Sequence, residues 1–297
     1  MRRRIVIGVV IAFAVLMVCI LLWNATFSFL TFGLSHDQED LVELWEESRY
    51  EDVYSRASDA LIKDPLDDDY LVLHGFAAFY SAVIQHDSGQ SFSLLKEGII
   101  SLRRALLLAP ASQAVEVEYV LGKAYYHMGS YYYDLAVRHL LAAYDDGNRS
   151  DDIFEYLGLA YRKIEQYAKA EEWFERGVER TSSPATEINL AEVLFLQEKY
   201  AQAMEHAREV ISLSDDSLLQ LQANILIGRI YLDTDRLGLA ENHFTAMLDQ
   251  HSAVADVRYW LGETYQGEDK PILARAEWRE AVRIDPHHAL AAQRLQN

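Results

Sequence analysis

The sequence predicts an all-α protein: an α-solenoid of about seven helix–turn–helix repeats, preceded by one amino-terminal transmembrane helix. Three observations predict this fold. An uncharged run from Ile5 to Leu34 opens the chain, and a motif recurs after it at intervals near 34 residues. The composition also has few helix breakers, with 5 prolines and 14 glycines among 297 residues, and 11% aromatic residues. Such a composition is typical of a folded helical protein rather than a disordered one.

Residues 1–33 are predicted to form a cytoplasmic amino terminus and a membrane anchor. Three arginines, Arg2 to Arg4, precede the apolar run, whose densest part extends from Ile5 to Trp23. As a helix these residues are roughly 28 Å long, close to the ~30 Å thickness of a hydrocarbon core. The next charged residues, from Asp37 to Glu43, are all acidic. By the positive-inside rule, we expect a single-pass inner-membrane protein whose remaining residues lie outside the cytoplasm, in the periplasm of a bacterial envelope.

Other interpretations of this segment remain. A cleaved signal peptide has a shorter apolar region and a small-x-small cleavage site, and no good site of that kind follows here. A lipoprotein signal would end at Cys19, but Val18 is bulky where a small residue is expected and apolar residues follow the cysteine. A reversed topology, with the repeats in the cytoplasm, is a further alternative. An uncleaved anchor agrees best with the length of the run.

Charge and cysteine content exclude several functions. The net charge is −19, and it becomes −22 when the three amino-terminal arginines are left out. So acidic a domain repels nucleic acid and anionic lipid headgroups, and we expect no nucleic-acid partner. Cys19 is the only cysteine and lies in the predicted anchor, which excludes an intramolecular disulfide and a cysteine metal site.

The repeated motif is clearest near the carboxyl end. There Leu261-Gly262 is followed by Tyr265, Ala274 and Trp278, and the same spacing starts at Gly228, 34 residues earlier. Further copies start at Leu157-Gly158, Leu190-Ala191 and Leu121-Gly122, the last with a two-residue insertion. These residues resemble the tetratricopeptide repeat, a 34-residue helix–turn–helix unit, over roughly Leu34 to His288.

The resemblance implies seven repeats and a helical carboxy-terminal tail at 289–297. The second repeat is degenerate, and its length predicts about eleven extra residues between its helices. The first has no glycine at the position where the paired helices meet. The repeat ranges are about 34–67, 68–114, 115–150, 151–183, 184–220, 221–254 and 255–288.

Local signals agree with helical pairs. Small residues such as Gly262 and Ala274 let paired backbones approach, and large ones such as Trp278 fill the space beside them. Ser183-Pro184 predicts a helix start, since serine caps helices and proline suits their first position. Similar starts are predicted at the polar segments 67–69, 150–151 and 215–217. We interpret the acidic residues there as caps rather than calcium ligands, because no EF-hand pattern is present.

Motifs that carry chemistry are scarce. No phosphate-binding loop, dinucleotide fingerprint or His-Glu-x-x-His motif occurs, so we expect no enzyme, no cofactor and no metal site. His86-Asp87-Ser88-Gly89 contains the residue types of a hydrolase triad, but neighbours in one loop do not converge easily, and a polar turn is predicted. His139, His206 and His243 occupy equivalent places on second helices and are predicted to be surface histidines.

The resemblance implies that the first helix of each repeat lines a concave groove. Such a surface suits an amphipathic helix or an extended apolar segment of a partner, although several of these residues could instead pack between repeats. The candidate groove residues are Val72, Phe76, Phe79, Tyr119, Lys123, Tyr126, Leu159, Arg162, Ile188, Phe195, Ile225, Arg229, Leu232 and Tyr259.

Co-chaperones of this family clamp carboxylate tails with lysine and asparagine on successive first helices. That pairing is absent at the corresponding places here: Tyr119, Lys123, Glu155, Leu159, Ile188 and Glu192. We therefore expect a non-enzymatic, membrane-anchored scaffold or assembly factor that binds envelope proteins. The alternatives are a chaperone-like factor for exported clients at a translocon and an enzyme that uses Ser88.

Overall fold

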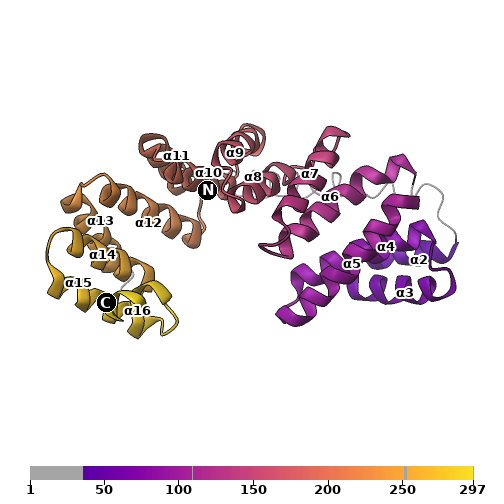
Figure 1. Cartoon of the computed structure of the whole chain (residues 1–297), viewed down its shortest axis with the longest axis horizontal. Helices are drawn as coiled ribbons and strands as arrows, with labels where there is room; N and C mark the ends of the chain where they lie inside the picture. Colours follow the sequence, from indigo (N-terminus) through magenta and orange to yellow (C-terminus); the bar gives the residue numbers. More distant parts are fainter. Residues whose placement is uncertain (1–35, 109, 251–252, 297) are drawn as a thin grey trace, which may run out of the picture. The chain divides into compact units, whose positions relative to one another are not determined.

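The computed structural model describes residues 36–108, 110–250 and 253–296, and these residues form fifteen helices and no strand. The all-α prediction is confirmed for this part of the chain (Figure 1). The helices are α2 (His36–Glu46), α3 (Tyr50–Lys63), α4 (Asp68–Ile84), α5 (Ser88–Leu108), α6 (Ala111–His127), α7 (Tyr133–Asp145), α8 (Ile153–Lys163), α9 (Tyr167–Thr181), α10 (Pro184–Leu196), α11 (Tyr200–Leu213), α12 (Ser217–Asp233), α13 (Leu237–Gln250), α14 (Ala255–Gly267), α15 (Pro271–Ile284) and α16 (Ala289–Gln296).

The predicted anchor at 1–33, including Cys19, lies outside the described residues. Among the helices that are described, none combines the length and the apolar character needed to cross a membrane. The chain divides into two compact units, one ending at Ala160 and the other beginning at Tyr161. The helices of each unit pack mainly against their neighbours in sequence, as in α4 with α5 and α14 with α15.

Close approach of paired helices depends on small residues, as predicted. A Cβ atom placed on Gly262 of α14 would lie 2.6 Å from Cδ1 of Trp278 on α15. On Gly228 of α12 it would lie within 2.9 Å of three ring carbons of Phe244 on α13. Because real Cβ atoms do not come so close to other atoms, the large side chain of each pair occupies the space that the glycine leaves.

The turns inside most of the described hairpins share one geometry. Five hairpins place a non-glycine residue in the left-handed region, with φ between 57° and 59°: Ser48, Glu165, Glu198, Asp235 and Asp269. In each case the next residue donates its N–H to a carbonyl five residues earlier, as Lys199 N does to Leu194 O at 2.9 Å. This pattern ends the first helix and satisfies its last carbonyls.

The second repeat differs from the prediction. Its extra residues do not form an insertion between the helices, because only residues 85–87 separate α4 from α5. They lengthen the helices instead, to 17 residues in α4 and 21 in α5. Asp87 allows α5 to begin directly after the turn, since its Oδ1 accepts a hydrogen bond from Gln90 N at 2.8 Å.

Two predicted repeat boundaries also shift. The boundaries at 114 and 220 fall inside α6 and α12, which begin at Ala111 and Ser217. The caps explain both starts: Pro110 stands before α6 with extended backbone, and Asp216 accepts a hydrogen bond from Leu218 N at 2.7 Å. Helices α2 and α3 lie within the range predicted for the first repeat, and α16 lies within the predicted tail.

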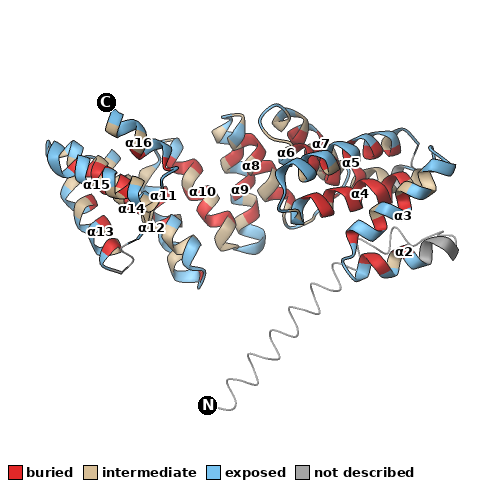
Figure 2. Cartoon of the chain, turned by 90° about the horizontal axis from the view of Figure 1, so that it is seen from below, coloured by how far each residue is buried: buried red, intermediate tan, exposed pale blue. Residues whose placement is uncertain are grey.

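The first helices of the repeats form the interior of each unit. In α4, nine consecutive residues from Leu71 to Phe79 are buried, so the helix is covered on all sides (Figure 2). Helix α4 packs against α3, α5 and α6 at once, which explains this burial. Helix α10 is similar, because it packs against α9, α11 and α12. Second helices such as α9 and α15 are buried on one face only.

Candidate functional site

The structure divides the fourteen candidate groove residues into two groups. Eight are buried: Val72, Phe76, Phe79, Tyr119, Lys123, Ile188, Phe195 and Tyr259. Six are half-buried: Tyr126, Leu159, Arg162, Ile225, Arg229 and Leu232. The buried side chains fill space between neighbouring helices and offer little area to another molecule. Any partner contact through this set therefore depends on the second group.

Lys123 illustrates a candidate residue that the chain uses itself. Its Nζ donates to Asp152 Oδ2 at 2.8 Å and to the Tyr119 hydroxyl at 3.2 Å. The same atom lies 4.8 Å from the ring centroid of Tyr119 and 4.9 Å from that of Tyr156. Tyr119 also donates to Asp152, and burial, together with the Asp152 charge, raises the pKa of Tyr119. Lys123 therefore joins α6 to the start of α8 and is not available to a ligand.

The accessible part of the set in the second unit lies on α12. Ile225, Arg229 and Leu232 are spaced four and three residues apart, so they share one face of this helix. Helix α12 packs against α10 and α14, the first helices of the neighbouring repeats. The face thus lies in a row of three first helices.

Arg229 lies over two aromatic rings. Its guanidinium carbon lies 4.4 Å from the ring centroid of Phe195 on α10 and 4.7 Å from that of Trp260 on α14. Its Nε is buried and makes no hydrogen bond to any described residue. Burial lowers the pKa of Arg229, and the charges of Asp233 and Glu192 oppose that shift.

The neighbouring cations of these first helices have carboxylate partners. Arg162 at the end of α8 forms an ion pair with Glu192 on α10. Arg258 on α14 donates to Glu277 on α15 at 2.8 Å. Arg229 forms no ion pair with the described residues, which distinguishes it from both.

The prediction that the histidines of the second helices are surface residues is wrong. His139 is buried, with Nδ1 2.5 Å from Glu118 Oε2. His206 and His243 are half-buried, and each contacts the first helix of its own repeat. Nδ1 of His206 lies 2.7 Å from Glu187 Oε2, and Nε2 of His243 lies 2.8 Å from the carbonyl oxygen of residue 224. The surface prediction failed because this position faces the partner helix rather than solvent.

A spacing in the sequence could have revealed these contacts. His206 and His243 follow their partners by 19 residues, and Arg258 precedes Glu277 by the same number. In the third repeat, which has the two-residue insertion, His139 follows Glu118 by 21. The hydrogen bond to Glu187 raises the pKa of His206, whereas burial lowers the pKa of His243. The position is thus a polar link inside four of the described hairpins.

The structure also places a serine beside a histidine. Ser101 Oγ lies 3.0 Å from Nδ1 of His74, but both residues are buried between α4 and α5, so no substrate reaches them. The predicted polar turn at 86–89 is shorter in the structure, because Ser88 and Gly89 already begin α5 and Asp87 is engaged as its cap. Neither group presents an accessible nucleophile with a base beside it.

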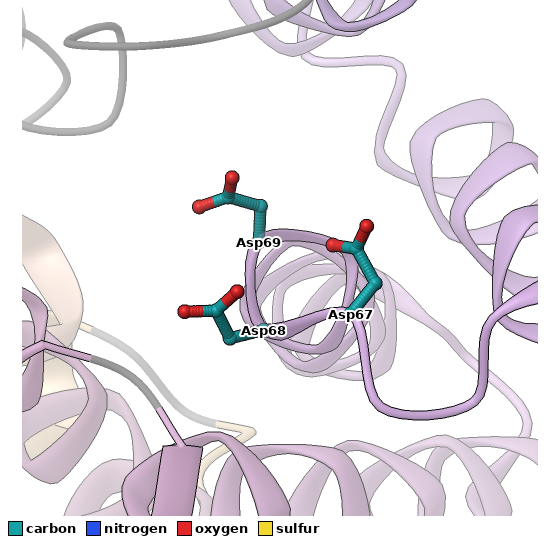
Figure 3. Close-up of side chains that lie close together, drawn as sticks. All are labelled: Asp67, Asp68 and Asp69. Carbon is teal, nitrogen blue, oxygen red and sulfur yellow. The ribbon is translucent and has the colours of Figure 1, made fainter.

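The acidic segment 67–69 begins α4 (Figure 3). Its three carboxylates offer oxygen atoms within 4.8 Å of one another. Asp67 Oδ1 accepts a hydrogen bond from Tyr70 N at 3.0 Å, which confirms the predicted cap. Asp69 Oδ1 accepts one from Gln113 Nε2 at 3.2 Å, which joins the first turns of α4 and α6. Two of the three side chains thus have structural contacts.

Comparison with known proteins agrees with this architecture. Residues 157–183 match the family model described as tetratricopeptide repeat. The fold is similar to that of the C-terminal part of a tetratricopeptide repeat protein from Cytophaga hutchinsonii, with a TM-score of 0.62, 14% identity, and 86% of this chain and 98% of that chain covered. A tetratricopeptide repeat protein from Parabacteroides merdae gives a TM-score of 0.58 at 15% identity, with coverage of 87% and 96%.

A third similar structure is the APC/C hetero-tetramer Cut9–Hcn1, with a TM-score of 0.55 and 15% identity. The match covers 86% of this chain but only 47% of that chain, so this protein spans about half its length. No curated protein has a sequence that matches this chain. At these identities the likeness concerns the fold, which is that of a tetratricopeptide-like helical solenoid.

Proposed function

We propose that this protein is a membrane-anchored adaptor that binds protein partners through the first helices of its repeats. The observation that carries the proposal is the half-buried face of α12, where Ile225, Arg229 and Leu232 combine apolar surface with a cation that forms no ion pair with the described residues and whose Nε has no hydrogen-bond partner among them. A face of this kind suits an extended or helical segment of another protein. Tetratricopeptide-like folds are suited to protein–protein interaction, because stacked repeats present a continuous surface.

The anchoring part of the proposal rests on the sequence of residues 1–34 and on the charges beside it. We place the repeats outside the cytoplasm, where envelope proteins would be the partners, because the arginines precede the apolar run and acidic residues follow it. Helix α2 begins at His36, three residues after the predicted anchor ends at residue 33. The first unit would therefore lie directly at the membrane surface.

Exposed apolar side chains support this placement. Paired helices are antiparallel, so the start of α2 lies at the same end of the first unit as the carboxyl ends of α3 and α5. At that end Ile62, Leu66 and Leu107 are 79%, 63% and 84% exposed. Contact with a bilayer or with another membrane protein would remove this apolar surface from water.

Partner binding is tested by photocrosslinking in native membranes. A photoreactive residue at Ile225 or Leu232 samples the α12 face, whereas Ile188, the centre of the predicted groove, is 4% exposed and cannot reach a partner without repacking. The control position is Gln202, which is exposed on the second helix α11. One dominant envelope protein captured from α12 and not from Gln202 is the expected result. A broad set of exported proteins would favour a chaperone-like role, and equal capture from both positions would contradict the proposed face.

Topology and membrane contact need separate tests. A carboxy-terminal reporter that is active only after export should be active, and an inactive reporter would place the repeats in the cytoplasm. A polarity-sensitive fluorophore at Leu107 in the full chain, reconstituted in lipid bilayers, should report a less polar environment than one at Tyr131. Tyr131 is 94% exposed and lies in the α6–α7 turn, at the opposite end of the first unit.

A further inference from the structure

Helix α5 has an exposed face that runs along most of its length. The helix packs against α4 and α6, which cover its other side. Phe92, Ile100 and Leu107 are 51%, 44% and 84% exposed. Because they follow one another at intervals of about two turns, they lie on one side of the helix, over roughly 22 Å. Together with the exposed cations between them they form the α5 face: Phe92, Lys96, Ile100, Arg103, Arg104 and Leu107.

The α5 face is positively charged, in a chain whose net charge is −19. Glu97 is the only carboxylate of α5, and two neighbouring hydroxyl groups donate hydrogen bonds to it. Lys96 and Arg104 form no ion pair with a described residue. Arg103 interacts with Tyr125 of α6, where its charge opposes the rise in the pKa of Tyr125 that burial causes. Two cations of the face are therefore available to an anion outside the chain.

The other described second helices lack this combination. Helix α15 has the exposed arginines Arg275 and Arg279, but its exposed large apolar residues, Ile272 and Leu273, lie in the first turn alone. At 21 residues, α5 is the longest of the described helices, so the extra length of the second repeat provides room for the face. The outer sides of α3 and α9 carry several exposed carboxylates: Glu51, Asp52, Asp59, Glu172, Glu175 and Glu179.

A row of apolar and basic side chains suits the surface of an anionic bilayer. Helices of this composition lie in the plane of the interface, with their apolar side chains at the boundary between headgroups and acyl chains. Lysine and arginine place their long apolar stems along that boundary, while their charged ends reach the phosphate groups. An acidic protein would also match the cations. The bilayer, however, is the partner that the proposed anchor already holds beside the first unit.

The anchor brings the face within reach of the bilayer. The densest part of the apolar run ends at Trp23, and α2 begins at His36, thirteen residues later. Such a length spans at most about 45 Å, so the outer side of α5 can reach the surface. The negative net charge opposes approach mainly at long range, and salt screens it beyond a Debye length of about 8 Å. Because the anchor makes long-range attraction unnecessary, the charges nearest the bilayer decide the contact.

We propose that the α5 face is a membrane contact in addition to the anchor, and that it lies lengthwise on a bilayer containing anionic phospholipid. Lys96 and Arg104 bind lipid phosphate groups, and the three apolar side chains of the face enter the headgroup region. This inference rests on the anchoring part of the proposed function. It also orients the first unit, because the first helices α4 and α6 then lie on the side of α5 that faces away from the bilayer.

The test uses the full chain in nanodiscs of phosphatidylcholine, with or without phosphatidylglycerol. Because Cys19 is the only cysteine, a Cys19→Ser chain accepts a polarity-sensitive fluorophore at one introduced site. Ile100→Cys places the fluorophore at the centre of the α5 face. Ser55→Cys is the matched control, because Ser55 is exposed on α3 between Asp52 and Asp59. The expected result is a shift to a less polar environment at Ile100 in the anionic nanodiscs, with no such shift at Ser55 or in the neutral nanodiscs.

Charge variants test the cause of the shift. Titrating the phosphatidylglycerol content gives the equilibrium constant of the contact. Lys96→Gln and Arg104→Gln should each lower this constant roughly fivefold, because a cation near an anionic surface strengthens binding by about that factor. Arg275→Gln and Arg279→Gln, which remove exposed arginines from α15, should leave it unchanged. Circular dichroism shows whether each variant keeps its helices.

Several outcomes would overturn the proposal. These are equal shifts in the two kinds of nanodisc, equal shifts at Ile100 and Ser55, and an unchanged constant in both the Lys96→Gln and Arg104→Gln variants. A fluorophore shift at Leu107 without one at Ile100 would show that the end of the unit, and not the length of α5, meets the bilayer. A shift at Ile100 that requires added envelope proteins would assign the face to an acidic protein instead.

The same samples separate this inference from the proposed function. If the chain stays in the nanodiscs and Ile100 remains in a polar environment with both lipid compositions, the α5 contact fails and the anchored adaptor stands. If the chain separates from the nanodiscs, the anchor fails and the α5 contact fails with it. Capture of a partner from Leu232 tests the adaptor function independently of both.

Discussion

Replacing Gly228 with alanine is expected to destabilise the second unit, even though alanine is the better helix former. The substitution gains roughly 0.8–1.0 kcal/mol of helix propensity on α12. Its Cβ, however, would lie within 2.9 Å of three ring carbons of Phe244. That ring is fully buried and packs with Leu248, Val257 and Leu261, so it has no free space to move into. Overpacking of this kind costs about 1–3 kcal/mol, and the three close ring carbons place Phe244 in the upper part of that range, so we expect a net loss of up to about 2 kcal/mol.

Gly238 provides a matched control, because it lies in α13, the second helix of the same hairpin. It is the second residue of α13, and a Cβ placed on it meets nothing within 4 Å. Gly238→Ala should therefore stabilise the protein by about 0.5 kcal/mol, through backbone entropy alone. The two substitutions make the same chemical change in one hairpin, and opposite signs are expected.

Urea unfolding of the full chain in detergent, followed by far-ultraviolet circular dichroism, measures both effects. Because repeats unfold locally, hydrogen exchange of the α12 and α13 amides is the second readout. Gly228→Ala should lower the protection of these amides and Gly238→Ala should raise it slightly. If Gly228→Ala stabilises the chain by the full helix propensity of alanine, roughly 0.8–1.0 kcal/mol, Phe244 moves without cost, and the argument that glycine is required for helix contact is refuted.

Three further predictions concern single side chains. Glu198→Gly should stabilise the chain by about 1 kcal/mol in urea unfolding, because Glu198 has a φ of 59° that glycine adopts without strain; a loss of stability would contradict this. Glu187 raises the pKa of His206 above 6.5, so protonated His206 stabilises the fold below that pH and the effect disappears as pH rises through the raised value. The stability difference between wild type and Glu187→Gln should accordingly be larger at pH about 5 than at about 8.5. Lys123→Met should cost about 2 kcal/mol, less than the ~3–5 kcal/mol of a fully buried pair, because Asp152 is 40% exposed; an unchanged unfolding midpoint would show that the contact contributes little.

Much of the fold follows from local patterns in the sequence. Glycine and a large side chain recur at fixed spacing, and Gly262 does contact Trp278 as that spacing predicts. Polar residues before apolar helices also act locally, which is why Asp67 could be predicted as a cap. Helix lengths in the second repeat were harder to predict. The repeat spacing shows that this unit has extra residues, but it does not show whether they lengthen α4 and α5 or form a loop between them.

The candidate site was less predictable, because burial depends on neighbouring repeats. The repeat pattern indicates which residues face the inner side of a first helix, but not how closely the next first helix approaches. Val72 and Ile188 are therefore buried, although they occupy inner positions as Ile225 does. The environment of Arg229 depends on Phe195, 34 residues earlier, and on Trp260, 31 residues later. Neither ring belongs to the repeat that contains Arg229, so the sequence of that repeat alone does not reveal this environment.

The internal pairing of the inner cations bears on which partners so acidic a chain attracts. With a net charge of −19, a general attraction for acidic partners is excluded, and the long-range field favours neutral or basic ones. Lys123 and Arg162 do not change this, because each forms an ion pair inside the chain, with Asp152 and Glu192. Binding of a basic partner should accordingly weaken as ionic strength rises, because salt screens the long-range attraction. An affinity that stays constant with salt would show that short-range contacts, and not the net charge, drive the association.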